Sequence, residues 1–337
     1  MVVLHPLPSG LKTYVVSDAG ATEVAPEVAW FGAFDVIQVC GRVDPVLVRN
    51  FRAASLAPVV FTSRSNAKAL DRLGTRPPAL ERNSKQDSLV GLANAVVACS
   101  NAEAEELRLD YPQFAEKISF IHNALDPGLL SAIGRVDVGS RGTTEPAFAF
   151  VGRLRTHKGI LDLLNVCEGL WQEGLAFRFK IAGGHTHQGE SVVQSLLART
   201  LRLWPNWLEM HKWSDDPAQV ASVYRSVHCV ISPSRYEPFG LVAVEALAAG
   251  CYVIASDAGG LRETLTGLSC ATTYVRGDED ALRHEVRRFV LGPLWTVMDT
   301  QRCEHWIRSR FAADRMAARY LELYSKLIGD ISSKCGL

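Results

Sequence analysis

The chain lacks any apolar stretch of about 18 residues, the length that a membrane-spanning helix needs. Its opening residues, Met1 to Pro6, have neither the basic start nor the length of a signal peptide. Charge of one sign is not in excess either, because acidic and basic residues number 36 each. These absences predict a cytoplasmic protein that neither spans a membrane nor coats nucleic acid.

Cysteine pairs at metal-binding or redox spacing are also missing. The eight cysteines are scattered, and no two of them form a C-x-x-C pair. The sequence therefore indicates neither a zinc site nor a disulfide framework. Cys99, Cys229 and Cys251 lie in apolar, strand-like runs and are interpreted as small buried hydrophobic residues, which fits a reducing cytoplasm.

Length and regular alternation are what the chain does have. Its 337 residues, 47% apolar and 21% charged, exceed what one hydrophobic core usually organises. Short apolar strands alternate with helical stretches before residue 134 and again from residue 147, and a glycine- and threonine-containing stretch between them indicates a linker. The pattern predicts an α/β protein with two parallel-sheet domains, over 1–138 and 145–310, that bind a ligand in the cleft between them.

The most informative stretch runs from Pro233 to Gly250, between two apolar strand-like runs. A turn built on prolines carries Glu237, and an apolar helix beginning near Gly240 carries Glu245 eight residues later. Eight residues span a little over two helical turns, so the helix can present both carboxylates to one cleft. Two carboxylates at a helix N-terminus predict a ligand that is both anionic and rich in hydroxyl groups.

A second stretch, from Phe148 to Gly159, ends a strand at Gly152 and continues as a basic loop. Arg153 and Lys158 lie in this loop, next to the start of the following helix. A bound diphosphate requires two cations and a positive helix end, although a loop cation taken alone is just as often solvated. Together with the two glutamates, the loop is interpreted as a phosphate site.

These stretches resemble the retaining, nucleotide-sugar-dependent glycosyltransferases of the GT-B fold, known as glycosyl transferases group 1. The matching motifs follow the family's order and spacing: Val151-Gly-Arg153…Lys158-Gly159, Ile181-Ala-Gly-Gly184, the E-x7-E element Glu237…Glu245 and Ala258-Gly-Gly-Leu-Arg-Glu263. The resemblance implies two Rossmann-like domains whose parallel sheets face a central cleft. It assigns the acceptor to 1–138 and the donor to 145–310. A helix over 311–330 would cross back to the first domain, with Trp306, Phe311 and Tyr320 packing there.

The resemblance also implies catalytic roles for residues of the two loops. Arg153 and Lys158 match residues that bind the donor diphosphate, and cations fixed there lower the barrier to its departure. Glu237 matches the glutamate that touches the transferred sugar, where a carboxylate stabilises a cationic anomeric carbon. Glu245 matches the glutamate that holds the ribose hydroxyls of the donor.

Backbone groups complete the donor site that the resemblance implies. Gly152 ends the strand before the basic loop, and Phe239, Gly240 and Leu241 match a turn whose N–H groups meet the sugar and the distal phosphate. Gly10 could match the glycine loop that faces the donor phosphates, but an ordinary turn after two prolines explains it equally well.

The first domain matches the family less closely. Gln38 and Cys40 stand in a strand where the family often has histidines, and Arg64 stands where a histidine that contacts the sugar or acceptor is common. Arg64 is the candidate for the acceptor side. Few residues precede Phe34, which indicates that a strand–helix–strand portion is missing or remodelled.

Two patterns suggest a metal ion, and both have a simpler explanation. His185 and His187 lack a third ligand, so they are interpreted as a loop pair. Asp278-Glu-Asp280 has the D-x-D form of metal-dependent glycosyltransferases of another fold, but it precedes a helix start, where acidic residues cap the helix. We therefore expect no metal and no cofactor besides the donor substrate.

The sequence predicts a retaining, hexosyltransferase-like enzyme that moves a sugar from a nucleoside-diphosphate sugar to a hydroxyl acceptor, in bacterial glycoconjugate, polysaccharide or natural-product biosynthesis. The alternative is a catalytically degenerate partner subunit or glycan-binding protein, which the short first domain favours. A phosphorylase or epimerase of the same fold is a third, weaker interpretation. Expected partners are the donor and a hydroxyl acceptor, with membrane contact only if that acceptor is lipid-linked; the oligomeric state stays open.

Overall fold

The chain forms two compact units. The computed structural model describes residues 2–6, 12–17, 35–41, 43–54, 56–74, 80–134, 145–184, 191–212, 214–292 and 300–335. The first unit combines the residues up to Asn123 with those from Asp314 onward, and the second unit is Ala124–Ala313. Among the described residues, no helix combines the length and the apolar character needed to cross a membrane.

The first division between the units falls at residue 123, earlier than the boundary expected at 138. Asp126 caps helix α5 (Pro127–Ile133) by accepting a hydrogen bond from Leu129 N–H. Helix α5 packs against α8 (Pro217–Arg225) of the second unit, and Arg225 Nη1 donates to the Ala132 carbonyl at 2.8 Å. This segment therefore joins the second unit.

The sheet of the first unit has its strands in the order in which they occur in the chain, β1-β2-β3-β4-β5-β6. The strands are β1 (Val2–Pro6), β2 (Lys12–Ser17), β3 (Val36–Cys40), β4 (Val59–Thr62), β5 (Ala95–Ala98) and β6 (Ile118–Phe120). Strands β2 to β6 are parallel, but β1 pairs with β2 in antiparallel fashion. The expected parallel arrangement is wrong for β1, because the few residues between β1 and β2 cannot form the crossover that parallel strands need.

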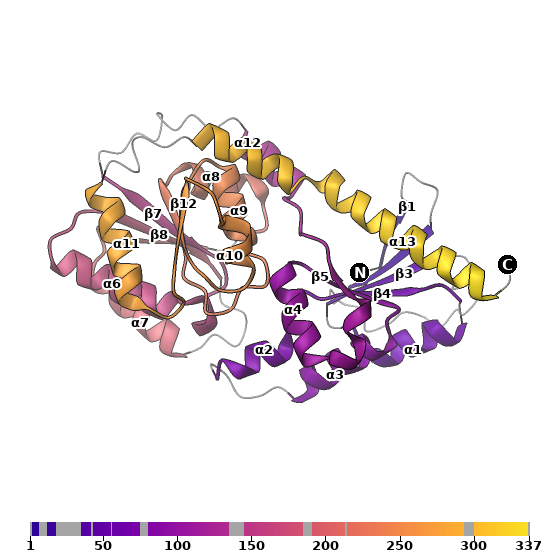
Figure 1. Cartoon of the computed structure of the whole chain (residues 1–337). Coiled ribbons are helices and arrows are strands. Elements are labelled where there is room, and N and C mark those ends of the chain that lie inside the picture. The colour runs from indigo at the N-terminus through magenta and orange to yellow at the C-terminus, as the bar shows by residue number, and fades with distance from the viewer. Residues whose placement is uncertain are drawn as a thin grey trace. The chain divides into compact units, whose positions relative to one another are not determined.

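This sequential order fixes which face of the sheet each helix covers. The helices of this unit are α1 (Pro45–Ala54), α2 (Ala67–Arg72), α3 (Leu80–Leu92), α4 (Asn101–Asp110), the 3₁₀ helix η2 (Pro112–Lys117) and α13 (Ala313–Cys335). Each strand from β2 onward is added on the same side, so right-handed crossovers place α1, α3 and α4 on one face. Figure 1 shows them there, with α13 along the opposite face.

A separate apolar core lies on each face of this sheet. Phe51, Leu89 and Leu107 from the crossover helices belong to one core. On the other face, Tyr324 of α13 is buried with Val36 and other strand residues. The C-terminal helix therefore belongs to the core of the first unit.

Gln38 takes part in the docking of α13. Its Nε2 donates to Thr62 Oγ1 at 2.9 Å, and its Oε1 accepts from the Tyr324 hydroxyl at 2.5 Å. The Tyr320 hydroxyl lies 3.3 Å from the same Thr62 oxygen. Where the family often has a histidine, this chain has a side chain that holds the C-terminal helix through hydrogen bonds.

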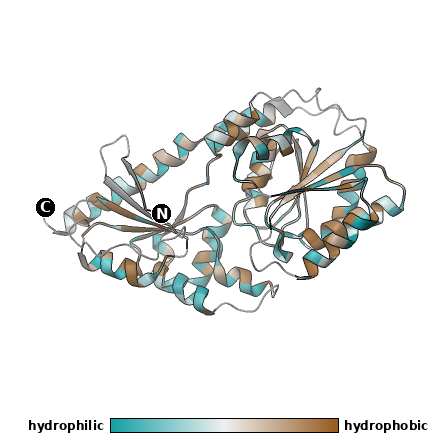
Figure 2. Cartoon of the chain, turned by 180° about the vertical axis from the view of Figure 1, so that it is seen from behind, coloured by the Kyte–Doolittle hydropathy of each residue, from teal (hydrophilic) through white to brown (hydrophobic). Residues whose placement is uncertain are grey.

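The second unit has a parallel sheet in the order β12-β11-β10-β7-β8-β9. Its strands are β7 (Ala147–Val151), β8 (Arg178–Gly183), β9 (Leu208–Lys212), β10 (Cys229–Ser232), β11 (Tyr252–Ser256) and β12 (Ala271–Tyr274). Its further helices are the 3₁₀ helix η4 (Thr156–Lys158), α6 (Ile160–Gln172), α7 (Ser191–Leu203), α9 (Leu241–Ala248), α10 (Gly260–Leu265), α11 (Glu279–Leu291) and α12 (Thr300–Arg310). The inner strands β7, β10 and β11 are buried along their whole length, and Figure 2 shows the strands of this sheet as largely hydrophobic.

The C-terminal part of the described chain forms two helices with a break between them. Helix α12 ends at Arg310 and α13 begins at Ala313. The Phe311 ring packs edge-on against Phe239 of the second unit, with centroids 5.4 Å apart, and Trp306 packs against Phe311. The expectation that Trp306 and Phe311 pack on the first domain is therefore wrong. Because of this break, α12 packs against α9 of the second unit, whereas α13 belongs to the first unit.

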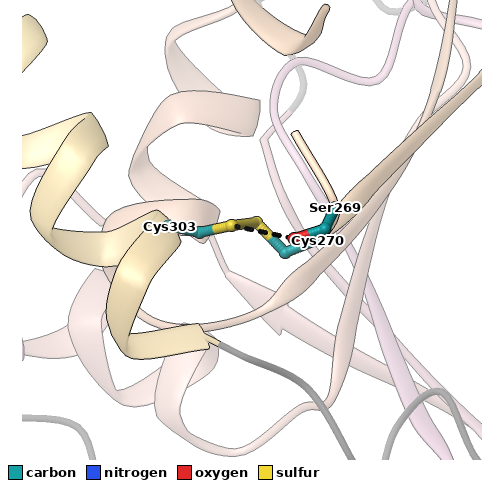
Figure 3. Close-up of a disulfide and its surroundings, with 3 residues drawn as sticks. All are labelled: Ser269, Cys270 and Cys303. Carbon is teal, nitrogen blue, oxygen red and sulfur yellow. Dashed lines mark hydrogen bonds between the residues drawn. A yellow bond between two sulfur atoms is a disulfide. The ribbon is translucent and has the colours of Figure 1, made fainter. Parts of the chain in front are cut away.

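A disulfide joins two elements of the second unit. Cys270, just before β12, is bonded to Cys303 of α12, with their Cα atoms 6.6 Å apart (Figure 3). No sequence pattern indicated this bond, because the two cysteines are separated by 33 positions along the chain and are brought together only by the fold. Disulfides persist mainly in oxidising compartments, so the cysteine pattern no longer supports a reducing cytoplasm.

Reduction of this disulfide is expected to destabilise the second unit. A cross-link closing a loop of 33 residues is worth about 2–4 kcal/mol in the chain-entropy model. Dithiothreitol should therefore lower the melting temperature in calorimetry by several degrees, about 2–4 °C per kcal/mol for a unit of this size. The variant Cys303→Ser should melt at the reduced value and show no further response; an equal effect of dithiothreitol on both proteins contradicts the prediction.

Candidate functional site

The two stretches singled out in the sequence meet at one place in the second sheet. Strands β8 and β9 follow β7 on one side, and β11 and β12 follow β10 on the other, so the strand order reverses between β7 and β10. In open α/β sheets, ligands bind at the carboxyl ends of the strands where this reversal occurs. The loop after β7 carries Gly152 to Gly159, and the loop after β10 carries Pro233 to Gly240.

The two loops touch through their backbones. Gly159 has φ +71°, and a Cβ built on it would overlap the carbonyl oxygen of Pro233. The Arg235 N–H donates to the His157 carbonyl at 2.8 Å. Only glycine allows both the left-handed conformation and the close approach, so Gly159 fixes one loop against the other.

An ion pair that sequence reasoning missed strengthens this contact. Arg235 donates from Nε to Asp162 Oδ2 at 3.1 Å and from Nη2 to Oδ1 at 2.9 Å. Asp162 lies in the first turn of α6 with a side chain only 10% exposed. Two-point guanidinium pairs of this kind are strong and directional. The only sequence signal was an arginine two residues before Glu237.

Lys158 and Glu237, both expected in the site, form an ion pair. Lys158 Nζ donates to Glu237 Oε2 at 2.7 Å, and the side chains are 19% and 14% exposed. Ser234 Oγ donates to the same oxygen at 3.2 Å. On its other side, the Glu237 carbonyl accepts from Gly260 N–H at 2.9 Å. A cation and a carboxylate are thus held in contact on two fixed loops.

Glu245 lies on α9 and has a different partner. Its Oε2 accepts a hydrogen bond from the Tyr224 hydroxyl of α8 at 2.7 Å. Burial raises the pKa of Glu245 to about 7; the Tyr224 hydrogen bond lowers this pKa, and the nearby charge of Asp126 raises it. Neither Tyr224 nor Asp126 could be predicted as a neighbour of Glu245, because each comes from a different element of the chain.

The remaining residues of the basic loop lie at the rim of the site. Gly152 N–H donates to the Ala182 carbonyl at 2.9 Å, which ends β7 beside β8. Arg153 follows with an exposed side chain, whereas Leu154 is buried and anchors the loop. The fold thus places Arg153 and Lys158 on one loop, on either side of a buried leucine.

The turn before α9 is arranged for backbone contacts. Phe239 is buried, with its ring against Phe311, so its side chain serves packing. Gly240 has φ +97° and stands at the N-cap of α9, and Leu241 opens the helix with a side chain 38% exposed. No side chain caps this helix start.

Two of the predicted site residues, Arg64 and Gly10, do not belong to the two loops of the second unit. Arg64 lies in the first unit, exposed and two residues after β4. Gly10 lies outside the described residues, as do His185 and His187.

Asp278 caps α11, accepting a hydrogen bond from Ala281 N–H at 2.9 Å, which accounts for the D-x-D pattern. Within the described ranges, no group of three or more histidine, cysteine or acidic residues could hold a metal ion.

A cavity of about 190 Å³ lies at the carboxyl ends of β7, β8 and β9, one face of it formed by α8. Val151, Ala182 and Val223 form apolar walls, and Lys212 and Gln219 supply polar groups. Val223 of the wall is next to Tyr224, the partner of Glu245. The cavity therefore lies beside the loop of Arg153 and close to the support of Glu245, where a flat polar ring could enter.

A family model described as Glycosyl transferases group 1 matches residues 137–308, slightly more than half of the chain. The chain belongs to this family. The D-inositol 3-phosphate glycosyltransferase of Segniliparus rotundus is 31% identical over 199 residues, covering 56% of this group 1 chain and 42% of the relative. The glycogen synthase of Mycobacterium tuberculosis (strain H37Rv) is 32% identical over 201 residues, covering 58% and 46%. The group 1 chain spans about half the length of the curated relatives it matches.

Solved structures share the fold of the group 1 chain. Sucrose-phosphate synthase from Thermosynechococcus elongatus superimposes with a TM-score of 0.76 at 19% identity, covering 98% of this chain and 86% of that one. HepE of Anabaena, solved in complex with UDP and glucose, gives a TM-score of 0.69 at 18% identity, covering 88% and 79%. The fold is GT-B, as the sequence motifs implied.

Proposed function

We propose that this chain transfers a sugar from a nucleoside-diphosphate sugar to a hydroxyl acceptor, with retention of anomeric configuration and without a metal ion. The observation that carries the proposal is the Lys158–Glu237 pair, held at the strand-order reversal of the second unit next to the helix that bears Glu245. Such a donor needs a cation that binds its phosphate groups and carboxylates that bind its hydroxyl groups.

The cations would act on the leaving group. Departure of a nucleoside diphosphate develops negative charge on its terminal phosphate, and Lys158 and Arg153 would stabilise that charge. Lys158 is half-buried, and a fixed cation there acts more strongly than one in water. The N-terminus of α9, which no side chain caps, would add its dipole toward the phosphates.

Glu237 would act on the sugar. The anomeric carbon becomes cationic as the leaving group departs, and a carboxylate nearby stabilises it and orients sugar hydroxyls. Retention would follow from attack on the face that the leaving group departs from, with the leaving phosphate oxygen taking the acceptor's proton. In this mechanism no residue of the chain forms a covalent bond with the sugar.

Glu245 and the cavity would hold the nucleoside. Glu245 would accept hydrogen bonds from the ribose hydroxyls, while the hydrogen bond from the Tyr224 hydroxyl holds its carboxylate in place. The cavity beside Val151 would receive the base between apolar walls, with Lys212 and Gln219 available for its polar edge. The relative HepE, solved with UDP and glucose, supports a nucleotide sugar as donor.

Nucleotide affinity is expected to depend on pH through Glu245. Its pKa of about 7 means that the carboxyl is protonated below pH 7 and accepts ribose hydroxyls fully only above it. The dissociation constant of UDP, ADP or GDP should therefore fall between pH 6 and pH 8 more steeply in the wild type than in Glu245→Gln. Phosphate ionisation affects both proteins equally. Tyr224→Phe removes a hydrogen bond that lowers this pKa and should move the midpoint to higher pH; identical profiles in all three proteins contradict the assignment.

The donor site is tested directly by nucleotide binding and turnover. UDP, ADP and GDP at millimolar concentration should raise the melting temperature, because a ligand that binds only the folded state stabilises it. Release of nucleoside diphosphate from a panel of nucleotide sugars, with and without sugar and lipid acceptors, then reports catalysis. If none of the three nucleotides shifts the melting transition, the proposed donor site is wrong.

A second candidate function is a catalytically inactive relative that binds a glycan or a partner transferase. The observation that favours it is Gln38, which replaces a family histidine and is engaged by Thr62 and Tyr324. Nucleotide binding without release of nucleoside diphosphate from any donor would favour this candidate over the enzyme.

A further inference from the structure

We propose that Glu237 competes with the donor's diphosphate for Lys158, so that the site prefers an intact nucleotide sugar over the bare nucleoside diphosphate. This inference rests on the function proposed above and deepens it. It gives Glu237 a role when no sugar is present: the carboxylate keeps the phosphate-binding cation neutralised and favours departure of the spent nucleotide.

The geometry of the pair is the first support. Lys158 Nζ lies 2.7 Å from Glu237 Oε2, and neither side chain is more than 19% exposed. Coulombic attraction over this distance is screened far less than between exposed charges. Any phosphate that approaches Lys158 therefore meets a carboxylate already in contact with the same ammonium.

The rigidity of the surrounding backbone is the second support. Gly159 is packed against Pro233, and Arg235 is tied to Asp162 by a two-point ion pair. Gly260 holds the Glu237 carbonyl on the opposite side. Because both loops are fixed, Lys158 and Glu237 separate only by side-chain rotation, and they come together again when no ligand intervenes.

The two ligands differ in what they offer Glu237. An intact donor brings sugar hydroxyls, which donate hydrogen bonds to the carboxylate while the diphosphate takes Lys158. A bare nucleoside diphosphate takes Lys158 and offers Glu237 nothing. The half-buried carboxylate is then left with Ser234 as its neutral donor and lies beside phosphate charge of the same sign, which is unfavourable. Transfer of the sugar converts the first situation into the second.

The test is calorimetric titration of the full chain with UDP, ADP and GDP and with UDP-glucose, ADP-glucose and GDP-mannose. Glu237→Gln keeps the shape of the side chain and removes its charge. The dissociation constant of the nucleoside diphosphate that binds the wild type should fall about 5- to 10-fold in this variant, the range expected for losing one charge-assisted contact. The matching nucleotide sugar should gain less, so the preference for the intact donor shrinks.

Glu173→Gln is the matched control. Glu173 is also an ion-paired glutamate of the second unit, but it lies at the far end of α6 with Arg283 and Arg287 as partners. Its substitution makes the same change in net charge and should leave nucleotide affinity unchanged. An equal gain in Glu173→Gln overturns the inference, because the effect would then be one of overall charge.

The outcomes separate this inference from the proposed function. Unchanged or weaker binding of the nucleoside diphosphate to Glu237→Gln, with normal binding to the wild type, overturns the competition and leaves the donor site standing. Absence of binding of all six nucleotides to the wild type overturns both. Glu237→Ala serves as a second variant and should tighten binding in the same direction. A merely damaged site would bind more weakly, so tighter binding reports the competition itself.

Discussion

Replacing Lys158 with alanine is expected to lower kcat/KM for the nucleotide-sugar donor by about 10²–10³-fold, the usual effect of removing one fixed group that stabilises developing charge. Lys158 lies where α6 begins, half-buried and in contact with Glu237. Its loss removes a cation that we propose stabilises the departing phosphate. It also leaves Glu237 without its charged partner, so the carboxylate repels that phosphate. Initial rates of nucleoside diphosphate release at several donor concentrations measure the effect.

Lys180 provides the matched control for this change. It is a lysine of the same unit with a side chain 20% exposed, and it donates to Ser226 Oγ at 3.1 Å. Because it belongs to β8 and pairs with Ser226 and Glu209, which lie outside both loops of the site, Lys180→Ala should keep turnover close to the wild-type value. Lys158→Arg should recover part of the lost rate, since it restores charge but not shape. Turnover of Lys158→Ala within threefold of the wild type would remove Lys158 from the proposed mechanism.

Gly159→Ala is expected to be the most damaging single-methyl change in the second unit. Alanine at φ +71° costs about 1–2 kcal/mol from the left-handed backbone alone. The added methyl group would also overlap the carbonyl oxygen of Pro233, a backbone atom that moves only with its loop. We expect a total loss of about 4 kcal/mol, at the upper end of single substitutions. The melting temperature in calorimetry and the rate of donor turnover both report it.

Gly174→Ala separates the two causes of the expected loss of stability, the left-handed backbone and the overlap with Pro233. Gly174 has φ +84°, but nothing lies within 4 Å of a Cβ built on it. This variant should lose only the conformational part, about 1–2 kcal/mol, and keep its turnover. Gly159→Ala should lose turnover even at temperatures where it remains folded, because Lys158 is displaced together with the loop. Equal stability losses in the two variants would show that the contact with Pro233 is unimportant.

The second unit was largely predictable from the sequence. Its central strands β7, β10 and β11 are apolar runs, and several of its helices begin at or just after glycine, proline or aspartate, so the pattern indicated the order of the elements. Lys158 and Glu237 were predicted from motif spacing, and the structure places them in contact. Tyr224 and Asp162 were not predicted, because a hydrogen bond across 21 residues and an ion pair across 73 leave no local pattern.

The first unit was less predictable for identifiable reasons. Helix α2 has only six residues, and the first turns of α3, from Leu80, are polar, so neither helix has a clear apolar pattern in the sequence. Gln38 stands where the family often has a histidine, and its hydrogen bonds show a structural use. The Cys270–Cys303 bond was invisible for another reason, since pairing depends on where strand β12 and helix α12 meet in space.

The sequential strand order of the first unit bears on how the chain folds during synthesis. Its described crossover helices lie on one face, and the opposite face is covered by α13, which is synthesised after the second unit. The residues up to Asn123 leave the ribosome first but cannot bury Val36 and Val60 against Tyr324 until the final helix arrives. Ala124–Ala313 is continuous and can fold meanwhile. The first unit therefore begins to be synthesised before the second but is completed after it, and the uncovered face of its sheet is exposed to misfolding and to chaperones in the interval.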